Sequence, residues 1–503
     1  MVEKFEFDSK LKKNLIIMMV IGVVGLIWAF LAGLHDGHHQ SRFWSNILLN
    51  VYYFTGIGIF GIFFVSANQL GYSGWITLVK RIYMSLSGFL VVAAVFALII
   101  IGGVWLHYHN LYDHWALPEE MKKLANTKQT FFNPTFWTVR VVLYFVLWVF
   151  VGKAVIKAIN SKDIADPKVY KRSKLMAALW IVIFAVTESF VSWDLVMSTD
   201  PHWYSTLFGW YNFASYGCAA FAMAILLVIF LKSRGHLPQV NENHIHDMGK
   251  YMFAWSILWS YMWFDQFMLQ WYANLPEDTN YWVKRFDVPL FKFTVALSVA
   301  INLGVPLLLF IKRGAKRNLK YAAFIAVVVF LGHYLDFFNQ TMFEPNAIAE
   351  TKECCKKGEG EAECCKKKEA ALATGATVFY AENKTEGKTE DKAAVKDEKP
   401  ATDAAKTETT EPKSAGEAAS QSNAEAKETK AEEKAEAKEG GKEEEAEEAP
   451  KTRASLGLPE LMILTGFLGA FLFMFFREFS KDTTFNENDP YLKESLRHHV
   501  EYA

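Results

Sequence analysis

Long apolar runs alternate with short polar segments over most of this chain. Ten runs are about twenty residues long, which is the length that an α-helix needs to cross the hydrocarbon core of a bilayer. We therefore predict an all-α integral membrane protein. Its ten transmembrane helices are expected at residues 15–34, 47–70, 82–106, 134–158, 175–197, 208–231, 250–274, 289–311, 319–341 and 457–476.

One segment breaks this pattern. Residues 346–455 consist mainly of Lys, Glu and Ala and contain too few apolar residues to bury a core. We predict a disordered, low-complexity insert between membrane domain 1–345, with nine spans, and region 456–503, with the tenth span and a tail. Its adjacent pairs Cys354-Cys355 and Cys364-Cys365 are poorly spaced for a tetrahedral metal site.

The distribution of Lys and Arg predicts the orientation of the helices. Residues 1–14 and every second connection after them carry 25 basic residues, whereas the alternate connections, without the insert, carry 7. Basic residues gather on the cytoplasmic side of membrane proteins. Both termini are therefore expected in the cytoplasm and the insert on the outer, periplasmic side.

Several ionisable side chains fall within the predicted spans. Such residues are costly in hydrocarbon unless they are paired, hydrated or protonated. Two interpretations remain open. Pairs between helices, such as Arg140 with Glu188 or Asp194, would satisfy one another, whereas a hydrated polar track would carry protons. Polar groups on four helices favour the track, and the candidates for a proton path are Glu188, Asp194, Asp265, His333, Asp336 and Arg140.

A second kind of site is conceivable at the outer ends of the spans. Oxidation of a quinol needs a proton acceptor beside an apolar pocket. Asp194, Asp265 and His202, in the turn Asp200-Pro201-His202-Trp203-Tyr204, are the candidates for quinone binding.

The sequence carries none of the usual motifs for bound cofactors. It has no C-x-x-C-H for covalent haem, no iron–sulfur cysteine series and no glycine-rich nucleotide motif. We expect no covalently bound cofactor, no metal site, no catalytic residue and no nucleic-acid partner. Any redox centre would then belong to partner subunits.

Three segments resemble a known family. They are DLVMSTDPHWYSTLFGWY (Asp194–Tyr211), HDMGKYMFAWSILWSYMWFDQFMLQWYANLPED (His246–Asp278) and NDPYLKESLRHH (Asn488–His499). They are similar to the large membrane subunits of bacterial alternative complex III, a quinol:cytochrome c oxidoreductase. These subunits belong to the polysulfide-reductase membrane-subunit (NrfD-like) family. The short polar N-terminus is more similar to the F-type than to the C-type of these subunits.

The resemblance implies a fold and a setting. The fold would be two four-helix bundles, spans 2–5 and 6–9, with flanking helices, in the bacterial inner membrane. Partners would be a multihaem cytochrome c subunit, an iron–sulfur subunit, a paralogous ten-helix membrane subunit and lipids. Haem c and iron–sulfur clusters would lie in those partners, and menaquinol would donate the electrons.

Three functions follow as hypotheses. The first is a membrane subunit that supports electron transfer from menaquinol to periplasmic redox subunits and supplies a proton path. The second is the quinol-binding subunit itself, as in a C-type paralogue. The third is a stand-alone ion transporter.

Overall fold

A computed structural model describes residues 4–36, 39–109, 111–122, 124, 126–342 and 457–498, which lie in one structural unit. Within these residues, regular structure is helical apart from one isolated bridge between Lys4 and Thr483. The predicted all-α class is therefore confirmed for this part of the chain. The insert at 346–455 and its two cysteine pairs lie outside the described residues.

The helices follow one another in two series. The series up to Thr199 consists of α1 (Ser9–Asp36), α2 (His39–Leu70), η1 (Trp75–Leu78), α3 (Lys80–Leu86), η2 (Ser87–Phe89), α4 (Leu90–Trp105), α5 (Asp113–Ala116), α6 (Pro118–Met121), α7 (Asn126–Phe131), α8 (Pro134–Val146), η3 (Leu147–Val151), α9 (Gly152–Ile159), α10 (Pro167–Val191), η4 (Ser192–Val196) and η5 (Met197–Thr199). The second consists of α11 (Leu207–Ser233), α12 (Glu242–Ala273), α13 (Pro276–Asp287), α14 (Pro289–Val299), η6 (Ala300–Gly304), α15 (Val305–Leu309), α16 (Arg313–Arg317), α17 (Leu319–Thr341), α20 (Leu458–Phe479) and α21 (Leu492–Leu496).

Nine helical segments in the described part of the chain are long and apolar enough to cross a membrane. They are Ser9–Ala32, Arg42–Leu70, Lys80–Trp105, Pro134–Ile159, Pro167–Thr199, Leu207–Ser233, Pro289–Leu309, Leu319–Thr341 and Leu458–Phe479. Nine of the predicted spans correspond to these segments. The prediction at 250–274 falls in α12, which has 32 residues and is long enough to span but is not among the nine. The second half of α12 contains the polar residues Asp265, Gln266 and Gln270.

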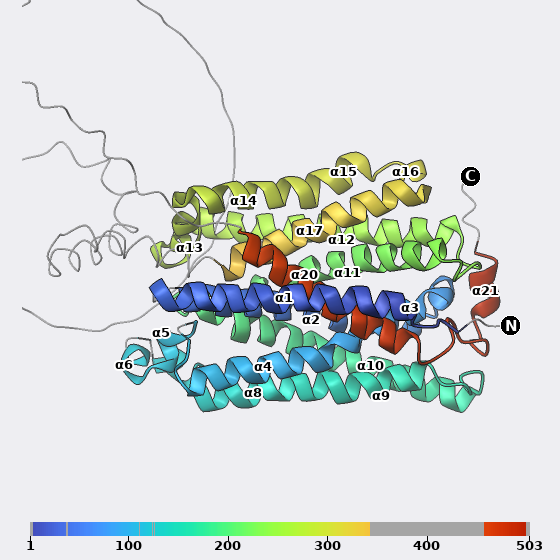
Figure 1. Cartoon of the computed structure of the whole chain (residues 1–503), viewed down its shortest axis with the longest axis horizontal. Coiled ribbons are helices and arrows are strands. Elements are labelled where there is room, and N and C mark those ends of the chain that lie inside the picture. The colour runs from blue at the N-terminus through green and yellow to red at the C-terminus, as the bar shows by residue number, and fades with distance from the viewer. Residues whose placement is uncertain are drawn as a thin grey trace, which may run out of the picture. The chain divides into compact units, whose positions relative to one another are not determined.

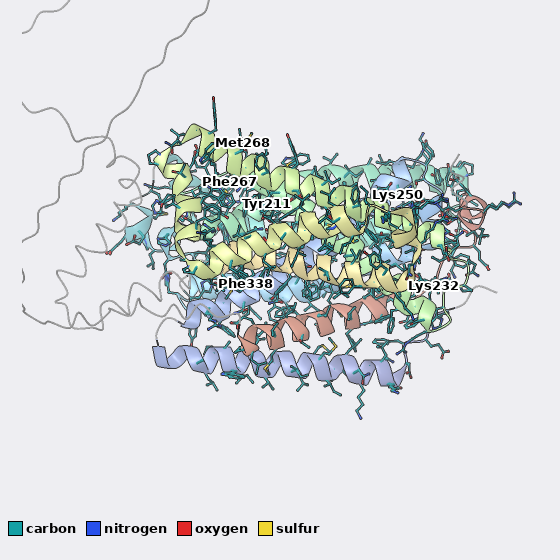
Figure 2. The ribbon with its side chains drawn as sticks, turned by 90° about the horizontal axis from the view of Figure 1, so that it is seen from above. Tyr211, Lys232, Lys250, Phe267, Met268 and Phe338 are labelled. Carbon is teal, nitrogen blue, oxygen red and sulfur yellow. The ribbon has the colours of Figure 1, made fainter. Side chains whose placement is uncertain are left out.

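The long helices run side by side, and the connections between them gather at two ends (Figure 1). The basic end carries α3, α9, α16 and α21, and the loop end carries α5, α6 and α13. Lys232 and Lys250 lie toward the basic end, whereas Phe267 and Met268 lie toward the loop end (Figure 2). The basic connections therefore gather at one end of the helices, as the sequence predicts.

Two helices form the centre of the packing. Buried residues make up 94% of the apolar window of α2 and 83% of that of α11, but only 22% of that of α1. The central helix α2 contacts α1, α3, α4, α10, α11 and α17. Around α11 lie α12 and α17, and α14 packs on α17. The polar side chains of Asn46 and Asn50 on α2 and of Asn212 and Ser215 on α11 are buried between the helices.

The first and last long helices pack directly against each other. A Cβ atom on Gly22 of α1 would lie 2.3 Å from the Cα atom of Gly466 on α20. Helices in a membrane associate through such small residues because these let the backbones approach closely. Both views show α1 and α20 side by side (Figures 1 and 2).

Candidate functional site

Asp194 lies in η4, a π-helical turn near the loop end of the span that begins with α10. It forms a two-pronged ion pair with Arg140 of α8: Nε donates to Oδ2 at 2.9 Å and Nη2 to Oδ1 at 2.6 Å. The Asp194 side chain is completely buried and that of Arg140 nearly so. Paired donors of this geometry make strong, specific charge-assisted hydrogen bonds.

Neutral groups complete the surroundings of this pair. Tyr144, one helical turn after Arg140, donates its hydroxyl to Asp194 Oδ2 at 2.8 Å. The Arg140 guanidinium lies between the rings of Phe131 and Phe136, at 4.1 and 4.3 Å from their centroids. This arrangement satisfies the carboxylate and shields it from solvent. Of the two acids that the sequence offers to Arg140, the structure pairs it with Asp194.

Aromatic side chains hold the end of the same helix in place. The last carbonyl groups of a helix have no partner within the helix. Here Trp137 donates its indole N–H to the carbonyl of Asp194 at 2.8 Å, Tyr112 donates to that of Leu195 at 2.8 Å and Trp115 to that of Ser198 at 2.9 Å. Tyr112 and Trp115 belong to the loop between α4 and α8. That loop is therefore an ordered cover over the Asp194 site.

Glu188 lies deeper in α10 and is also buried. Ser189 donates to its Oε2 at 3.1 Å, and Tyr52 and Tyr216 lie close enough to interact with it electrostatically. Among the described residues no Lys or Arg forms an ion pair with Glu188. This carboxyl group is thus surrounded by hydroxyl groups, and not by cations.

Asp336 of α17 is the centre of a second buried cluster. Three neutral groups donate to its carboxyl oxygens: Tyr211 to Oδ1, Ser215 to Oδ2 at 2.8 Å and Trp259 to Oδ2 at 2.9 Å. Tyr211 and Ser215 are one helical turn apart on α11, and Trp259 comes from α12. In the described part of the chain, no Lys or Arg forms an ion pair with this carboxyl group.

His333 lies one turn before Asp336 and is fully buried beside it. Its Nδ1 atom is 3.0 Å from the Ser215 hydroxyl. A hydroxyl group has one hydrogen to donate and can accept another. Ser215 can therefore donate to Asp336 and accept from His333, which joins two groups that can each carry a proton.

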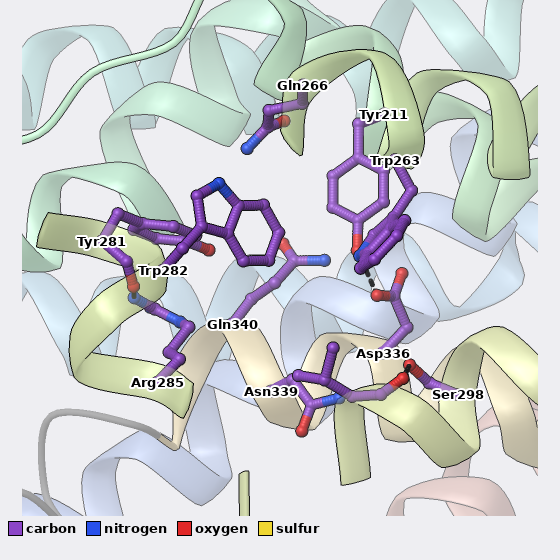
Figure 3. A pocket seen from close by; sticks show the side chains of 11 residues that line it. Tyr211, Trp263, Gln266, Tyr281, Trp282, Arg285, Ser298, Asp336, Asn339 and Gln340 are labelled. Carbon is purple, nitrogen blue, oxygen red and sulfur yellow. Dashed lines mark hydrogen bonds between the residues drawn. The ribbon is translucent and has the colours of Figure 1, made fainter. Parts of the chain in front are cut away.

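A small cavity adjoins Asp336 on its loop-end side (Figure 3). Its volume of about 20 Å³ is enough for an ordered water molecule. Gln266 Oε1 and Asn339 Nδ2 line it and have no hydrogen-bond partner among the described residues, so a bound water would satisfy them. Figure 3 shows Tyr211 bonded to Asp336 at the wall of this cavity.

Residues of α13 close the loop end of the cavity. The Arg285 guanidinium lies 3.5 Å from the ring centroid of Tyr281, and the ring of Trp203 stacks on that of Tyr281 with 3.9 Å between their centroids. Burial raises the pKa of Tyr281, and the charge of Arg285 opposes only part of this shift. The phenol is therefore neutral at physiological pH. Trp203 and Tyr281 therefore form part of a buried cover. Tyr204, Trp210, Trp271 and Tyr272, by contrast, are exposed aromatic residues in the neighbouring segments.

The remaining candidates from the sequence do not join either cluster. Asp265 is half-buried on α12, and no hydrogen bond or ion pair links it to Asp194. His202 is exposed in the loop before α11, with its ring 6.1 Å from that of His114. The three quinone-binding candidates are thus not brought together around a shared pocket in the described structure.

Sequence reasoning missed the neutral partners. Tyr144 follows Arg140 at four residues, and Ser215 follows Tyr211 at the same spacing. This spacing places each pair on one helix face, which was a usable indication. The part played by Trp259 has no such indication, because it depends on how α12 packs against α17.

No group of three or more His, Cys, Asp or Glu side chains in the described ranges is arranged to hold a metal ion. No protein-family model matches the chain, and a search of curated proteins found no relative.

Proposed function

We propose that this chain is a multi-pass membrane subunit of a quinol-oxidising respiratory complex, in which Asp336 is a step of a proton path. The observation that carries the proton path is the Asp336 cluster. A buried carboxyl group held only by neutral donors can take up and release a proton without breaking an ion pair. Asp194, by contrast, is committed to Arg140.

The proposed route uses the groups that surround Asp336. Ser215 joins it to His333, and the cavity extends from it toward Gln266 and Arg285 near the loop end. Asp336 lies five residues before the end of α17, which corresponds to about 8 Å along a helix. A proton leaving the carboxyl group has a short way to the loop end. Glu188 and Asp194 belong to span 5, outside the helices that surround Asp336. They stabilise the fold or form a parallel branch of the proton path.

The membrane arrangement belongs to the same proposal. Helix α12 is the tenth span, although it is more polar than the others. Spans 2–5 and 6–9 form two four-helix bundles, which the contacts around α2 and α11 support. The basic end faces the cytoplasm, in keeping with the positive-inside tendency, and the loop end faces the periplasm. There a multihaem cytochrome, an iron–sulfur subunit and a paralogous membrane subunit would bind, as the sequence resemblance implies.

The geometry favours this role over a quinol site built from the candidates at the loop end. The cavity beside Asp336 has room for water, not for a quinol ring, and Asp194, His202 and Asp265 do not converge. A stand-alone transporter remains the alternative from another class. Gentle purification of the tagged chain, followed by a haem spectrum and mass spectrometry, distinguishes a respiratory subunit from a stand-alone transporter. Co-purified cytochrome and iron–sulfur subunits support the proposal, and a colourless, solitary protein contradicts it.

The proton path is tested in the intact complex with Asp336→Asn. Quinol oxidation and proton release should both fall by about 100-fold, the usual contribution of a positioned proton-transfer group. Asp163→Asn, at an exposed acid on the basic end, is the control and should leave both unchanged. Tyr211→Phe, which removes one donor but keeps the carboxyl group, should give a smaller loss. Unaltered proton release in correctly assembled Asp336→Asn complex refutes the route.

A further inference from the structure

A second cavity opens at the basic end, between α3, α9 and the C-terminal end of α20. Its volume is about 580 Å³, within the usual range for small-molecule sites. We call it the basic cavity, and it is lined by Arg81, Met84, Ser85, Lys153, Ile156, Lys157, Asn160, Ser161, Lys162, Glu478, Lys481, Asp482, Thr483 and Asn486. It is distant from the Asp336 cluster and has no part in the proposed proton path.

The lining of the basic cavity has an excess of positive charge. Five of its residues are Lys or Arg, and two are acidic. Lys481 is paired with Glu478 at 2.5 Å, and Arg81 lies 3.6 Å from Asp482. These two contacts use both acids.

Three lysines of the cavity are left without a carboxylate. Lys153, Lys157 and Lys162 form no ion pair with an acidic residue in the described part of the chain, and all three are exposed. Like charges gathered in this way repel one another. An anion that binds between them would remove that repulsion.

The wall of the cavity adds a buried donor. Arg81 is 5% exposed, and its Nη2 atom donates to the carbonyl groups of Glu478 and Phe479 at 3.3 and 3.4 Å. Its Nε atom is buried and has no hydrogen-bond partner among the described residues. The orientation of this guanidinium is therefore fixed by backbone, while one donor remains to be satisfied.

The position of the cavity points to a lipid as the source of the anion. Three candidate spans begin or end beside it, at Lys80, Ile159 and Phe479, so it lies at the level of the lipid headgroups. Met84 and Ile156 form an apolar part of the wall of the cavity.

An exposed apolar surface leads to the cavity along the continuous segment of α8, η3 and α9. Val146 and Phe150 are exposed, by 45% and 69%, and Lys153 and Lys157 follow them at steps of three and four residues. Residues at this spacing lie on one face of a helix. An apolar strip therefore runs directly into two lysines, as would suit a molecule with acyl chains and an anionic head.

We propose that the basic cavity binds the phosphate-bearing headgroup of an anionic phospholipid, with its acyl chains along Val146 and Phe150. Basic pockets between transmembrane helices on the cytoplasmic side are suited to anionic lipid headgroups. A zwitterionic lipid offers no net charge to the three unpaired lysines. The proposal requires only that the chain spans a membrane and is independent of the respiratory role.

The test is native mass spectrometry of the full-length chain in detergent with added phosphatidylglycerol or phosphatidylcholine. One phosphatidylglycerol should remain bound, and phosphatidylcholine should not. Inorganic phosphate at the same concentration should not displace the lipid. Equal retention of both lipids overturns the proposal, and so does displacement by phosphate, which would identify a soluble anion as the ligand. This comparison needs no variant.

A triple variant then locates the site. Lys153→Gln, Lys157→Gln and Lys162→Gln together should weaken phosphatidylglycerol binding by roughly 100-fold, since each lysine near a charged lipid contributes about fivefold. Lys168→Gln, Lys171→Gln and Lys312→Gln remove the same charge from exposed positions at the same end, outside the cavity. This control should bind as the unaltered chain does. An equal loss in both triple variants would mean diffuse attraction and would overturn the proposal.

Discussion

Asp194 and Asp336 each lie five residues before the loop-end terminus of their span, yet only Asp194 is paired with an arginine. Arg140 holds both oxygens of Asp194, whereas Tyr211, Ser215 and Trp259 hold those of Asp336. Two carboxyl groups at the same residue position relative to the end of their span are thus placed in different chemical settings. One is suited to anchoring helices, and the other to exchanging a proton.

The anchoring role predicts the effect of Arg140→Leu. Removing one partner of a buried ion pair leaves an uncompensated charge and costs about 3–5 kcal/mol. The apparent Tm of the purified chain in detergent should fall markedly. The double variant Arg140→Leu with Asp194→Asn removes both charges and should recover most of the loss. A double variant less stable than Arg140→Leu alone would show that the pair is not the source of the stability.

The aromatic cover over this pair predicts a second effect. Tyr112→Phe removes the donor to the Leu195 carbonyl and leaves a buried acceptor unsatisfied, which costs about 1–3 kcal/mol. Limited proteolysis should then cleave the loop between α4 and α8 faster. Tyr108→Phe is the matched control, because that ring is 55% exposed. Equal cleavage of both variants would contradict the anchoring contact.

The contact between α1 and α20 predicts the effect of a larger side chain at Gly22. Gly22→Leu places a side chain where the backbone of Gly466 now lies, so the two helices must separate. We expect the apparent Tm of the purified chain in detergent to fall, because overpacking at a close contact forces the two backbones apart. Gly102→Leu is the control, since a side chain there meets open space. An unchanged Tm in Gly22→Leu would show that the close approach is not required.

The basic end predicts a dependence on pH. His244 Nε2 lies 3.2 Å from the Ser495 hydroxyl of α21, and burial, aided by the charge of His498, lowers the pKa of His244 to about 4. Asp247 opposes this shift and Lys232 adds to it. The unfolded segment takes up a proton near pH 6.5, the folded one only near pH 4. Stability is therefore full above pH 6.5 and declines as the pH falls toward 4.

Hydrogen exchange can measure the stability of this contact between His244 and α21. At pH 5 the docking of α21 should be weaker than at pH 7 by about 2 kcal/mol, which corresponds to faster exchange of its amides after correction for intrinsic rates. His244→Gln should abolish the difference between the two pH values. A pH dependence that persists in this variant would assign it to another group, such as the neighbouring pair His498 and Asp247.

The helices could be predicted from the sequence because a hydrocarbon environment permits few alternatives. Apolar length alone locates the spans, and the Lys and Arg count separates their two ends. Boundaries were less predictable. Span five continues to Thr199 through π- and 3₁₀-helical turns, because Trp137, Tyr112 and Trp115 satisfy carbonyl groups that would otherwise end it earlier. Those donors come from distant segments.

The candidate site was predictable in part, because polar residues at helical spacing are easily recognised in an apolar span. The stripe His333, Asp336, Asn339 and Gln340 is visible at helical spacing, and the structure buries all four. The partner of each acid depends on the packing of different helices, which periodicity does not determine. Helix α13, which covers the cavity, is short and polar and resembles a loop in sequence.

The pairing of α1 with α20 has a topological consequence. The first and last long helices are neighbours, so the fold closes on itself, while 114 residues separate Met342 from Gly457. The glycine contacts between the two helices can therefore bring α20 back to α1 without a covalent link. The polypeptide could accordingly be made as two separate pieces, divided between Met342 and Gly457, that reassemble in the membrane.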